Sequence, residues 1–246
     1  MTKTRATEGL IDSTTYLAHQ RVWVYGGSSD SLVREPTIDG LMSYYAQFIP
    51  PGNVYRQRLA GAEHAMPTDS FGNACRYLGD PYINNCRFDA ARALLEWLYG
   101  PLEPNVGAPT GRTIEFDQGE FISPPLENGM AETGWIYVPN SCATGRACRL
   151  HVAFHGCKQY QDYKYSGQRF GTTFVDHAGY KEAADANDII VLFPQATKYT
   201  YVLTPQWPNP DGCWDWWGYT NANYADKEGA QLAAVKRMVD RVANLH

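Results

Sequence analysis

The sequence contains RLHVAF at residues 149–154, followed by HGC at 155–157, and IIVLF at 189–193. The two apolar runs, 149–154 and 189–193, are separated by a stretch with helical spacing at 171–187. Continuous apolar runs bounded by polar and glycine residues are typical of strands that are covered on both faces. A strand, a helix and a second buried strand in this order are the repeating unit of an α/β fold. We therefore predict a mostly parallel sheet.

The rest of the chain continues this alternation. Strands are predicted at 21–25, 53–60, 112–116 and 134–138, and helices at 38–48, 88–100 and 227–244. The Pro- and Gly-rich segment at 101–111 could divide two domains, but neither half has a complete sheet of its own. We therefore predict one α/β domain, residues 1–246, in which residues 1–20 are irregular.

The composition excludes several classes of protein. The 246 residues carry 21 Lys and Arg against 26 Asp and Glu, and this acidic balance argues against a nucleic-acid-binding surface. No apolar run approaches the ~18–20 residues that a membrane span needs, and the chain is too apolar to be disordered. Its 7 Trp, 17 Tyr, 9 Phe and 6 Cys favour an exported protein that contacts a polymeric or apolar ligand.

The spacing of the six cysteines suggests three pairs, Cys75 with Cys86, Cys142 with Cys148, and Cys157 with Cys213. Spacing alone also allows six reduced thiols in a cytosolic protein. There is no C-x-x-C pair, so a zinc site is not expected. Disulfides would require an oxidising compartment, although residues 1–20 contain no signal peptide.

Three polar turns follow predicted strands, at the end where α/β folds place their sites: GGSSD at 26–30, GAEH at 61–64 and HGC at 155–157. Asp30 and then His64 have the order of the last two triad members of α/β-hydrolases. Asp30 would accept a hydrogen bond from one nitrogen of His64 and fix its tautomer, while the other nitrogen takes a proton from a serine. A single Asp or His in a turn is more often a cap or a solvated side chain, so both interpretations stay open.

The HGC turn fits an oxyanion hole, because Gly156 lets the backbone approach a substrate and the Cys157 N–H would point at the developing charge. The alternative for His155 is a turn residue that is hydrogen-bonded to backbone. His151 and His155 would lie roughly 13 Å apart on a strand, so they do not form a metal pair. We expect neither a metal nor a cofactor.

No nucleophile is evident, because the sequence contains no G-x-S-x-G motif. The nearest match, at 26–30, has Asp30 where the last glycine belongs, and a turn with Pro36 follows it instead of a helix. Ser28 is therefore a weak candidate. Cys157 is weaker still if it is disulfide-bonded.

The stretch at 207–219 concentrates aromatic residues in a loop that is rich in Pro, Gly and Asn. Trp214 and Trp216 could form a platform for sugar rings or polyester segments. They could equally cover the core beside a Cys157–Cys213 bridge.

Several of these motifs are specific in combination: RVWVYGGSSD, GAEHAMPTD, CRYLGDPYINNCRFDAARALLEWLYG, GWIYVPNSCATGRACRLHVAFHGCKQ, ADANDIIVLFPQA and NPDGCWDWWGY. Together they resemble the extracellular poly(3-hydroxybutyrate) depolymerases from about residue 20 to 244. The resemblance implies a circularly permuted α/β-hydrolase fold, since the order Asp30, His64 and then the HGC strand is that of the permuted members.

The same resemblance implies roles for individual residues. Asp30 would be the triad acid, His64 the general base and Cys157 an oxyanion donor. It also implies the three disulfides above and places the loop of Trp214 and Trp216 near the polymer-binding cleft. The ligand would be a polyester or an oligomeric ester.

The sequence departs from the family at its start, where the nucleophile-elbow strand and its helix are absent. We expect a truncated chain with little or no esterase turnover; the alternatives are a catalytically inactive homologue or assembly with a separate nucleophile-bearing segment. The resemblance implies an extracellular or periplasmic serine esterase that hydrolyses poly(3-hydroxybutyrate) or its oligomers. A feruloyl or acetylxylan esterase and a non-catalytic polymer- or glycan-binding protein remain open as alternatives.

Overall fold

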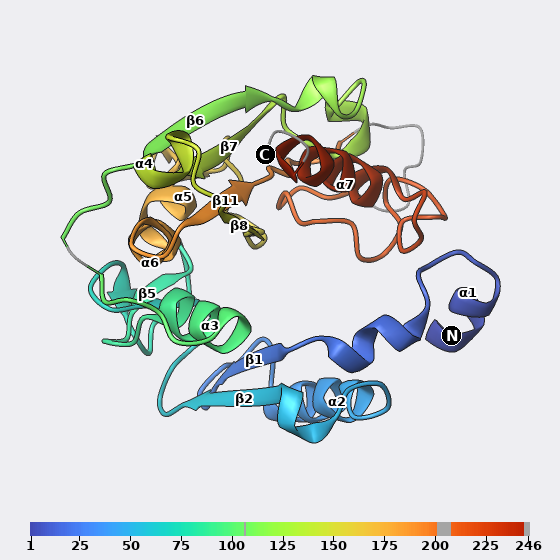
Figure 1. Cartoon of the computed structure of the whole chain (residues 1–246), viewed down its shortest axis with the longest axis horizontal. Helices are drawn as coiled ribbons and strands as arrows, with labels where there is room; N and C mark the ends of the chain where they lie inside the picture. Colours follow the sequence, from blue (N-terminus) through green and yellow to red (C-terminus); the bar gives the residue numbers. More distant parts are fainter. Residues whose placement is uncertain (106, 201–207, 244–246) are drawn as a thin grey trace. The chain divides into compact units, whose positions relative to one another are not determined.

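The computed structural model describes residues 1–105, 107–200 and 208–243, which form two compact units (Figure 1). The N-terminal unit comprises Met1–Leu102 with His177–Gly179, and the C-terminal unit comprises Glu103–Asp176 with Tyr180–His246. The boundary after Leu102 lies within the segment 101–111 that the sequence marks as a candidate linker. The assignment of residues 1–246 to a single domain stays a prediction.

The N-terminal unit contains, in chain order, α1 (Thr2–Thr7), η1 (Thr14–His19), β1 (Val22–Gly27), α2 (Glu35–Tyr45), η2 (Pro51–Asn53), β2 (Val54–Leu59), β3 (Met66–Thr68), β4 (Asn73–Ala74), β5 (Ile83–Asn85) and α3 (Ala90–Tyr99). β1 and β2 pair in parallel, from Val22 opposite Val54 to Gly27 opposite Leu59. α2 connects these two strands, and both α2 and α3 pack on β1, on opposite sides of the strand pair (Figure 1). The parallel pairing brings the carboxyl ends of β1 and β2 to the same edge.

Residues 1–20, predicted to be irregular, instead contain the short helices α1 and η1. The Ser13 side chain accepts a hydrogen bond from the Thr15 N–H and caps η1. A serine before a short polar segment is a local cap signal.

The second sheet of the N-terminal unit has the parallel order β3–β5–β4 and was not predicted. Its strands are short, and Asn occupies much of β4 and β5, so the sheet lacks the apolar alternation that marks a strand. The buried Asn84 amide stabilises them by donating to the Tyr77 carbonyl at 2.8 Å and to the Cys75 carbonyl at 3.3 Å. Cys75 is in turn bonded to Cys86.

The C-terminal unit contains, in chain order, β6 (Arg112–Asp117), η3 (Gln118–Glu120), η4 (Leu126–Asn128), β7 (Thr133–Val138), α4 (Asn140–Ala143), β8 (Arg149–Val152), β9 (Lys164–Tyr165), β10 (Gln168–Arg169), α5 (Thr173–His177), α6 (Tyr180–Asp185), β11 (Ile189–Phe193) and α7 (Ala230–Ala243). The last residue of α5, His177, is assigned to the N-terminal unit. Its main sheet has the order β6–β7–β11–β8, in which only the β11–β8 pair is parallel. β9 and β10 form a separate antiparallel pair.

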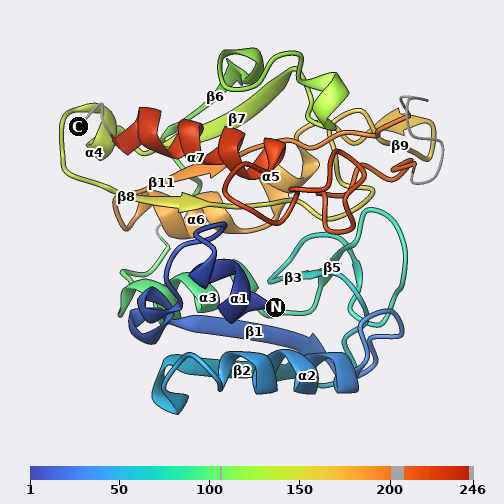
Figure 2. The ribbon, with the colours of Figure 1, turned by 90° about the vertical axis from the view of Figure 1, so that its right-hand side faces the viewer.

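The core of the C-terminal unit lies on both faces of β11, whose residues are all buried. Leu192 packs in a cluster with Met238 of α7, and the ring of its neighbour Phe193 contacts Tyr180 of α6. Successive side chains of a strand point to opposite faces, so α7 and α6 cover opposite sides of the sheet (Figure 2). This explains why IIVLF reads as one continuous apolar run.

One predicted helix is divided in two. The segment at 171–187 forms α5 and α6, and Gly179 between them has φ of +89°, a left-handed conformation that interrupts a helix. The predicted strand at 149–154 ends earlier, at Val152. The other predicted helices and strands are present with ends shifted by a few residues.

The structure forms three disulfides, Cys75–Cys86, Cys142–Cys148 and Cys157–Cys213, which is the pairing that spacing and resemblance suggested. Among the described residues, none of the helices has the length and apolar character that crossing a membrane requires.

Candidate active site

Asp30 and His64 lie beside each other where the chain leaves the parallel strands β1 and β2. The Nδ1 atom of His64 is 3.0 Å from Oδ2 of Asp30. The Asp30 side chain is only 7% exposed, whereas that of His64 is 39% exposed. The second oxygen of Asp30, Oδ1, accepts hydrogen bonds from the N–H groups of Leu32 and Val33, at 2.9 and 2.7 Å. The carboxylate is therefore fixed, and the imidazole reaches solvent.

Backbone hydrogen bonds join the turn after β1 to the turn after β2. The Ser28 N–H donates to the Leu59 carbonyl at 2.9 Å, and the Ser29 N–H donates to the Ala62 carbonyl at 3.0 Å. Gly27 permits this approach, because a Cβ at that position would lie 2.4 Å from the Ala62 oxygen. Close contact between the two turns is what brings Asp30 to His64.

The contact with Asp30 determines what His64 can do. A carboxylate accepts hydrogen bonds, so the imidazole proton lies on Nδ1 and the lone pair on Nε2. Among the residues that the structure describes, Nε2 has no hydrogen-bond partner. The negative charge of Asp30 also affects its surroundings: burial first, and then this charge, raise the pKa of Tyr25 to about 12. The arrangement leaves the Nε2 lone pair of His64 accessible.

Ser28, the weak candidate nucleophile, does not engage this base. Its Oγ accepts a hydrogen bond from the Gly61 N–H at 2.7 Å, and no hydrogen bond joins it to His64 within the described part of the chain. Its hydroxyl therefore connects the two turns.

His155 has a different environment. Its side chain is buried, with Nδ1 2.7 Å from the Gly156 carbonyl and Nε2 accepting from the Ala196 N–H at 3.1 Å. Burial lowers the pKa of His155 to about 4, so the ring is neutral at pH 7. These contacts support the interpretation of His155 as a turn residue bonded to backbone.

The Cys157 N–H has the property that an oxyanion donor needs. The neighbouring N–H groups are engaged, since that of Gly156 donates to Oε1 of Gln159 at 2.7 Å and that of Lys158 donates to the Asp211 carbonyl at 2.6 Å. The Cys157 N–H donates to no group among the described residues. Its disulfide with Cys213 makes this cysteine unavailable as a thiol nucleophile. The oxyanion role stays a prediction.

The two tryptophans named as ligand contacts differ in environment. The Trp214 ring packs against Phe154 and His155, with ring centroids 4.9 and 5.7 Å apart, so it covers the core. Trp216 is 72% exposed and is therefore available to a ligand. Trp207 lies outside the described residues.

Asp215, between these two tryptophans, organises the loop. Its carboxylate accepts from the N–H groups of Trp217, Gly218, Tyr219 and Thr220 and from the Thr220 hydroxyl. An aspartate that gathers backbone N–H groups of the following residues is a turn signal. That signal could have identified Asp215 from the sequence.

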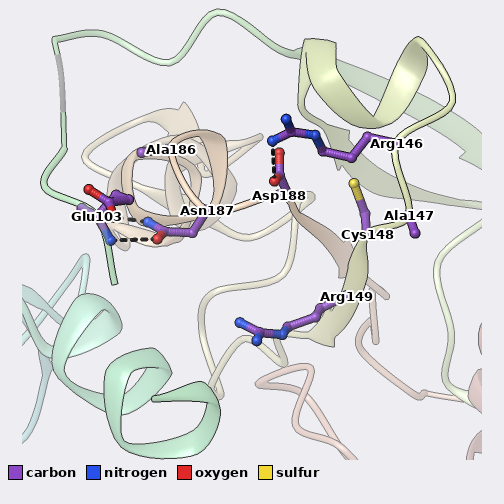
Figure 3. Close-up of a pocket in the computed structure, with 8 residues that line it drawn as sticks. All are labelled: Glu103, Arg146, Ala147, Cys148, Arg149, Ala186, Asn187 and Asp188. Atoms are coloured by element: carbon purple, nitrogen blue, oxygen red, sulfur yellow. Dashed lines mark hydrogen bonds and ion pairs between the residues drawn. The ribbon is translucent and has the colours of Figure 1, made fainter. Parts of the chain in front are cut away.

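A cavity of about 580 Å³ lies in the C-terminal unit (Figure 3). The Arg146 guanidinium pairs with the Asp188 carboxylate at 2.7 Å, and the Asn187 side chain bonds the backbone of Glu103. These polar groups bind one another, and of the predicted site residues only Cys148 lines the cavity. We assign it no role in the chemistry.

An Asp–His pair beyond the carboxyl ends of two parallel strands, in a chain that alternates helices and strands, is typical of the α/β-hydrolase class.

No known family model matches the sequence. The poly(3-hydroxybutyrate) depolymerase of Delftia acidovorans is 44% identical over 250 residues, which cover 99% of this chain and 46% of that protein. The polyhydroxybutyrate depolymerase of Talaromyces funiculosus is 37% identical over 244 residues, which cover 95% of this chain and 69% of that protein. The chain therefore belongs to the polyhydroxybutyrate depolymerase family, and it spans about half the length of the Delftia relative.

Two solved structures agree with this assignment. The crystal structure of the PHB depolymerase from Penicillium funiculosum has a TM-score of 0.86 and 33% identity, and the match covers 97% of this chain and 75% of that one. A serine-to-alanine variant of a PHB depolymerase, complexed with an R3HB trimer, has a TM-score of 0.85 and 35% identity, with coverage of 97% and 76%. The predicted α/β fold and the family resemblance are confirmed.

Proposed function

We propose that this chain contributes the acid–base pair of a serine esterase that hydrolyses poly(3-hydroxybutyrate) or its oligomers. The observation that carries the proposal is the 3.0 Å contact between His64 Nδ1 and Asp30 Oδ2. The substrate class is supported by the names of the two relatives and by the R3HB trimer bound to one solved homologue.

In the proposed reaction, Nε2 of His64 takes the proton of a serine hydroxyl as its oxygen attacks the ester carbonyl. Asp30 stabilises the resulting imidazolium, which then returns the proton to the leaving alkoxide. Water attacks the acyl-enzyme in the second half of the reaction, again with His64 as the base. The serine is not identified in this sequence, which contains no G-x-S-x-G motif.

Two further features support a polymeric substrate outside the cytosol. The exposed ring of Trp216 offers an apolar surface to a polyester segment. The three disulfides favour an oxidising compartment, such as the extracellular space or the periplasm.

The test measures how much 3-hydroxybutyrate is released from poly(3-hydroxybutyrate) granules by the protein encoded by the full reading frame that contains this sequence. The native form is compared with His64→Ala and Asp30→Asn, and we expect each substitution to lower turnover by about 10³-fold or more. Equal turnover in native and His64→Ala forms would contradict the proposal. So would hydrolysis of feruloylated xylan in preference to hydroxybutyrate oligomers, which would favour a carbohydrate esterase.

A further inference from the structure

Glu63 is a buried acidic residue that lies between the two polar turns. Its carboxylate accepts two hydrogen bonds from Ser31, one from the N–H at 2.8 Å and one from the hydroxyl. It also accepts from the N–H of His64 at 3.1 Å. Ser31 directly follows Asp30 in the chain, so one carboxylate joins the residue after the acid to the backbone of the residue that carries the base.

Both ends of this connection are anchored. The Glu63 N–H donates to the Cys75 carbonyl at 2.9 Å, and Cys75 is disulfide-bonded to Cys86. On the other side, the Asp30 carboxylate is fixed by the N–H groups of Leu32 and Val33. Burying a carboxylate is costly unless donors surround it, and the donors here come from the two turns that the base and the acid occupy.

We propose that Glu63 and Ser31 form a clamp that positions the Asp30 carboxylate against the His64 imidazole. Neither side chain transfers a proton in the reaction; both act through the geometry of the pair. The inference deepens the proposed function, because it concerns the same acid–base pair.

The test uses Ser31→Ala in the 246-residue chain, because this substitution cuts the clamp and leaves every charge near His64 in place. Among the described residues, the Asp30 carboxylate and the Tyr82 ring lie against the His64 imidazole, and the Glu63 carboxylate accepts from the His64 backbone N–H. The Arg76 guanidinium lies over Gly61 in the same turn. Glu63→Gln is a secondary variant, because it changes two things at once. It removes a negative charge, and it places a side-chain NH2 donor against the N–H and O–H groups that donate to the Glu63 carboxylate.

Two control variants lie in the same loop. Ser29→Ala removes an exposed hydroxyl from a residue that is held by its backbone N–H. Ser31→Thr keeps the hydroxyl and should restore the clamp. Asp30→Asn gives the reference value for a His64 that has lost its carboxylate.

The readout is the low-field proton resonance of His64 Nδ1–H, measured by NMR, because this proton lies in the hydrogen bond to Asp30. We expect Ser31→Ala to weaken the resonance, toward the spectrum of Asp30→Asn. Ser29→Ala and Ser31→Thr should behave like the native chain.

A Ser31→Ala spectrum that matches Ser29→Ala would overturn the proposal. Loss of the dispersed amide resonances of β1 and β2 in Ser31→Ala would also overturn it, because Ser31 would then be needed for the fold itself. This readout requires no ester turnover. A failure of the clamp is therefore distinguishable from a failure of the proposed hydrolysis.

Discussion

His64 and His155 occupy similar places in the sequence, each in a polar turn beyond a strand, but they differ in every physical property that matters for chemistry. His64 is partly exposed, with one nitrogen on a carboxylate. His155 is 2% exposed, and both of its nitrogens are bonded to backbone. The same residue type therefore carries an accessible nitrogen lone pair in one turn and is a buried, neutral structural element in the other.

The difference comes first from burial and then from the hydrogen-bond partners. A carboxylate beside a partly exposed ring stabilises its protonated form and so favours proton transfer. Burial disfavours the protonated form of His155, and the Ala196 N–H occupies the nitrogen that would take the second proton.

The largest effect is expected from His155→Ala. The substitution leaves the Ala196 N–H and the Gly156 carbonyl without their partner and opens a cavity, so the free energy of unfolding should fall by about 3 kcal/mol. His64→Ala should cost less than about 1 kcal/mol, since its ring is partly exposed. Urea unfolding of the two variants measures both values. Equal decreases in the free energy of unfolding would contradict the conclusion that His155 is structural and His64 is not.

A related effect is expected on acidification. The pKa of His155 is lowered to about 4 in the folded chain, against 6.5 ordinarily, so between these values the unfolded chain binds more protons. The free energy of unfolding should therefore fall as the pH drops from 7 to 4, by roughly 3 kcal/mol from this group.

Urea midpoints across this pH range measure the effect, and the slope should be smaller in His155→Ala. Part of the slope should remain in that variant, because burial also lowers the pKa of His151 to about 4. Identical slopes in the native and His155→Ala chains would contradict the assignment of a neutral, buried His155.

A smaller effect is expected from the tryptophans. Trp214→Ala removes packing against Phe154 and His155 and should cost about 2 kcal/mol. Trp216→Ala should change stability by less than about 0.5 kcal/mol and should weaken binding to polyhydroxybutyrate granules. Thermal unfolding and granule co-sedimentation separate the two roles. Unchanged co-sedimentation of Trp216→Ala would remove this ring from the proposed contact.

The smallest effect is expected in ester hydrolysis by the 246-residue chain alone. Because the Ser28 hydroxyl binds Gly61 and not His64, turnover of a nitrophenyl ester should be slight and unchanged by His64→Ala. Release of nitrophenol measures it. Robust turnover that both His64→Ala and Ser28→Ala abolish would instead identify Ser28 as the nucleophile.

Much of the fold could be predicted because its strands carry strong apolar patterns. β11 is buried on both faces and reads as IIVLF, so its limits were predicted to the residue. The sheet β3–β5–β4 could not be found in this way, because buried side-chain amides such as Asn84 stabilise it. A polar strand that depends on specific hydrogen bonds leaves no hydrophobic period in the sequence.

The candidate site likewise contains residues that the sequence predicts and one that it does not. Asp30 and His64 could be placed together because parallel strands end at one edge, and a turn follows each. Glu63 could not be assigned, because an acidic residue next to a histidine gives no sign of which donors will surround it. Its contact with Ser31 exists only after the two turns have met.

The five hydrogen bonds to Asp215 have a consequence for the proposed contact between Trp216 and a polymer. Ordering a backbone costs roughly 1–2 kcal/mol per residue at room temperature, and residues 215–220 have already lost that freedom during folding. In the proposed contact, a polyester segment that touches Trp216 therefore meets a loop that is already ordered, and little of the binding free energy is spent on ordering it. Such a preordered contact suits the polymeric ester that we propose as the substrate.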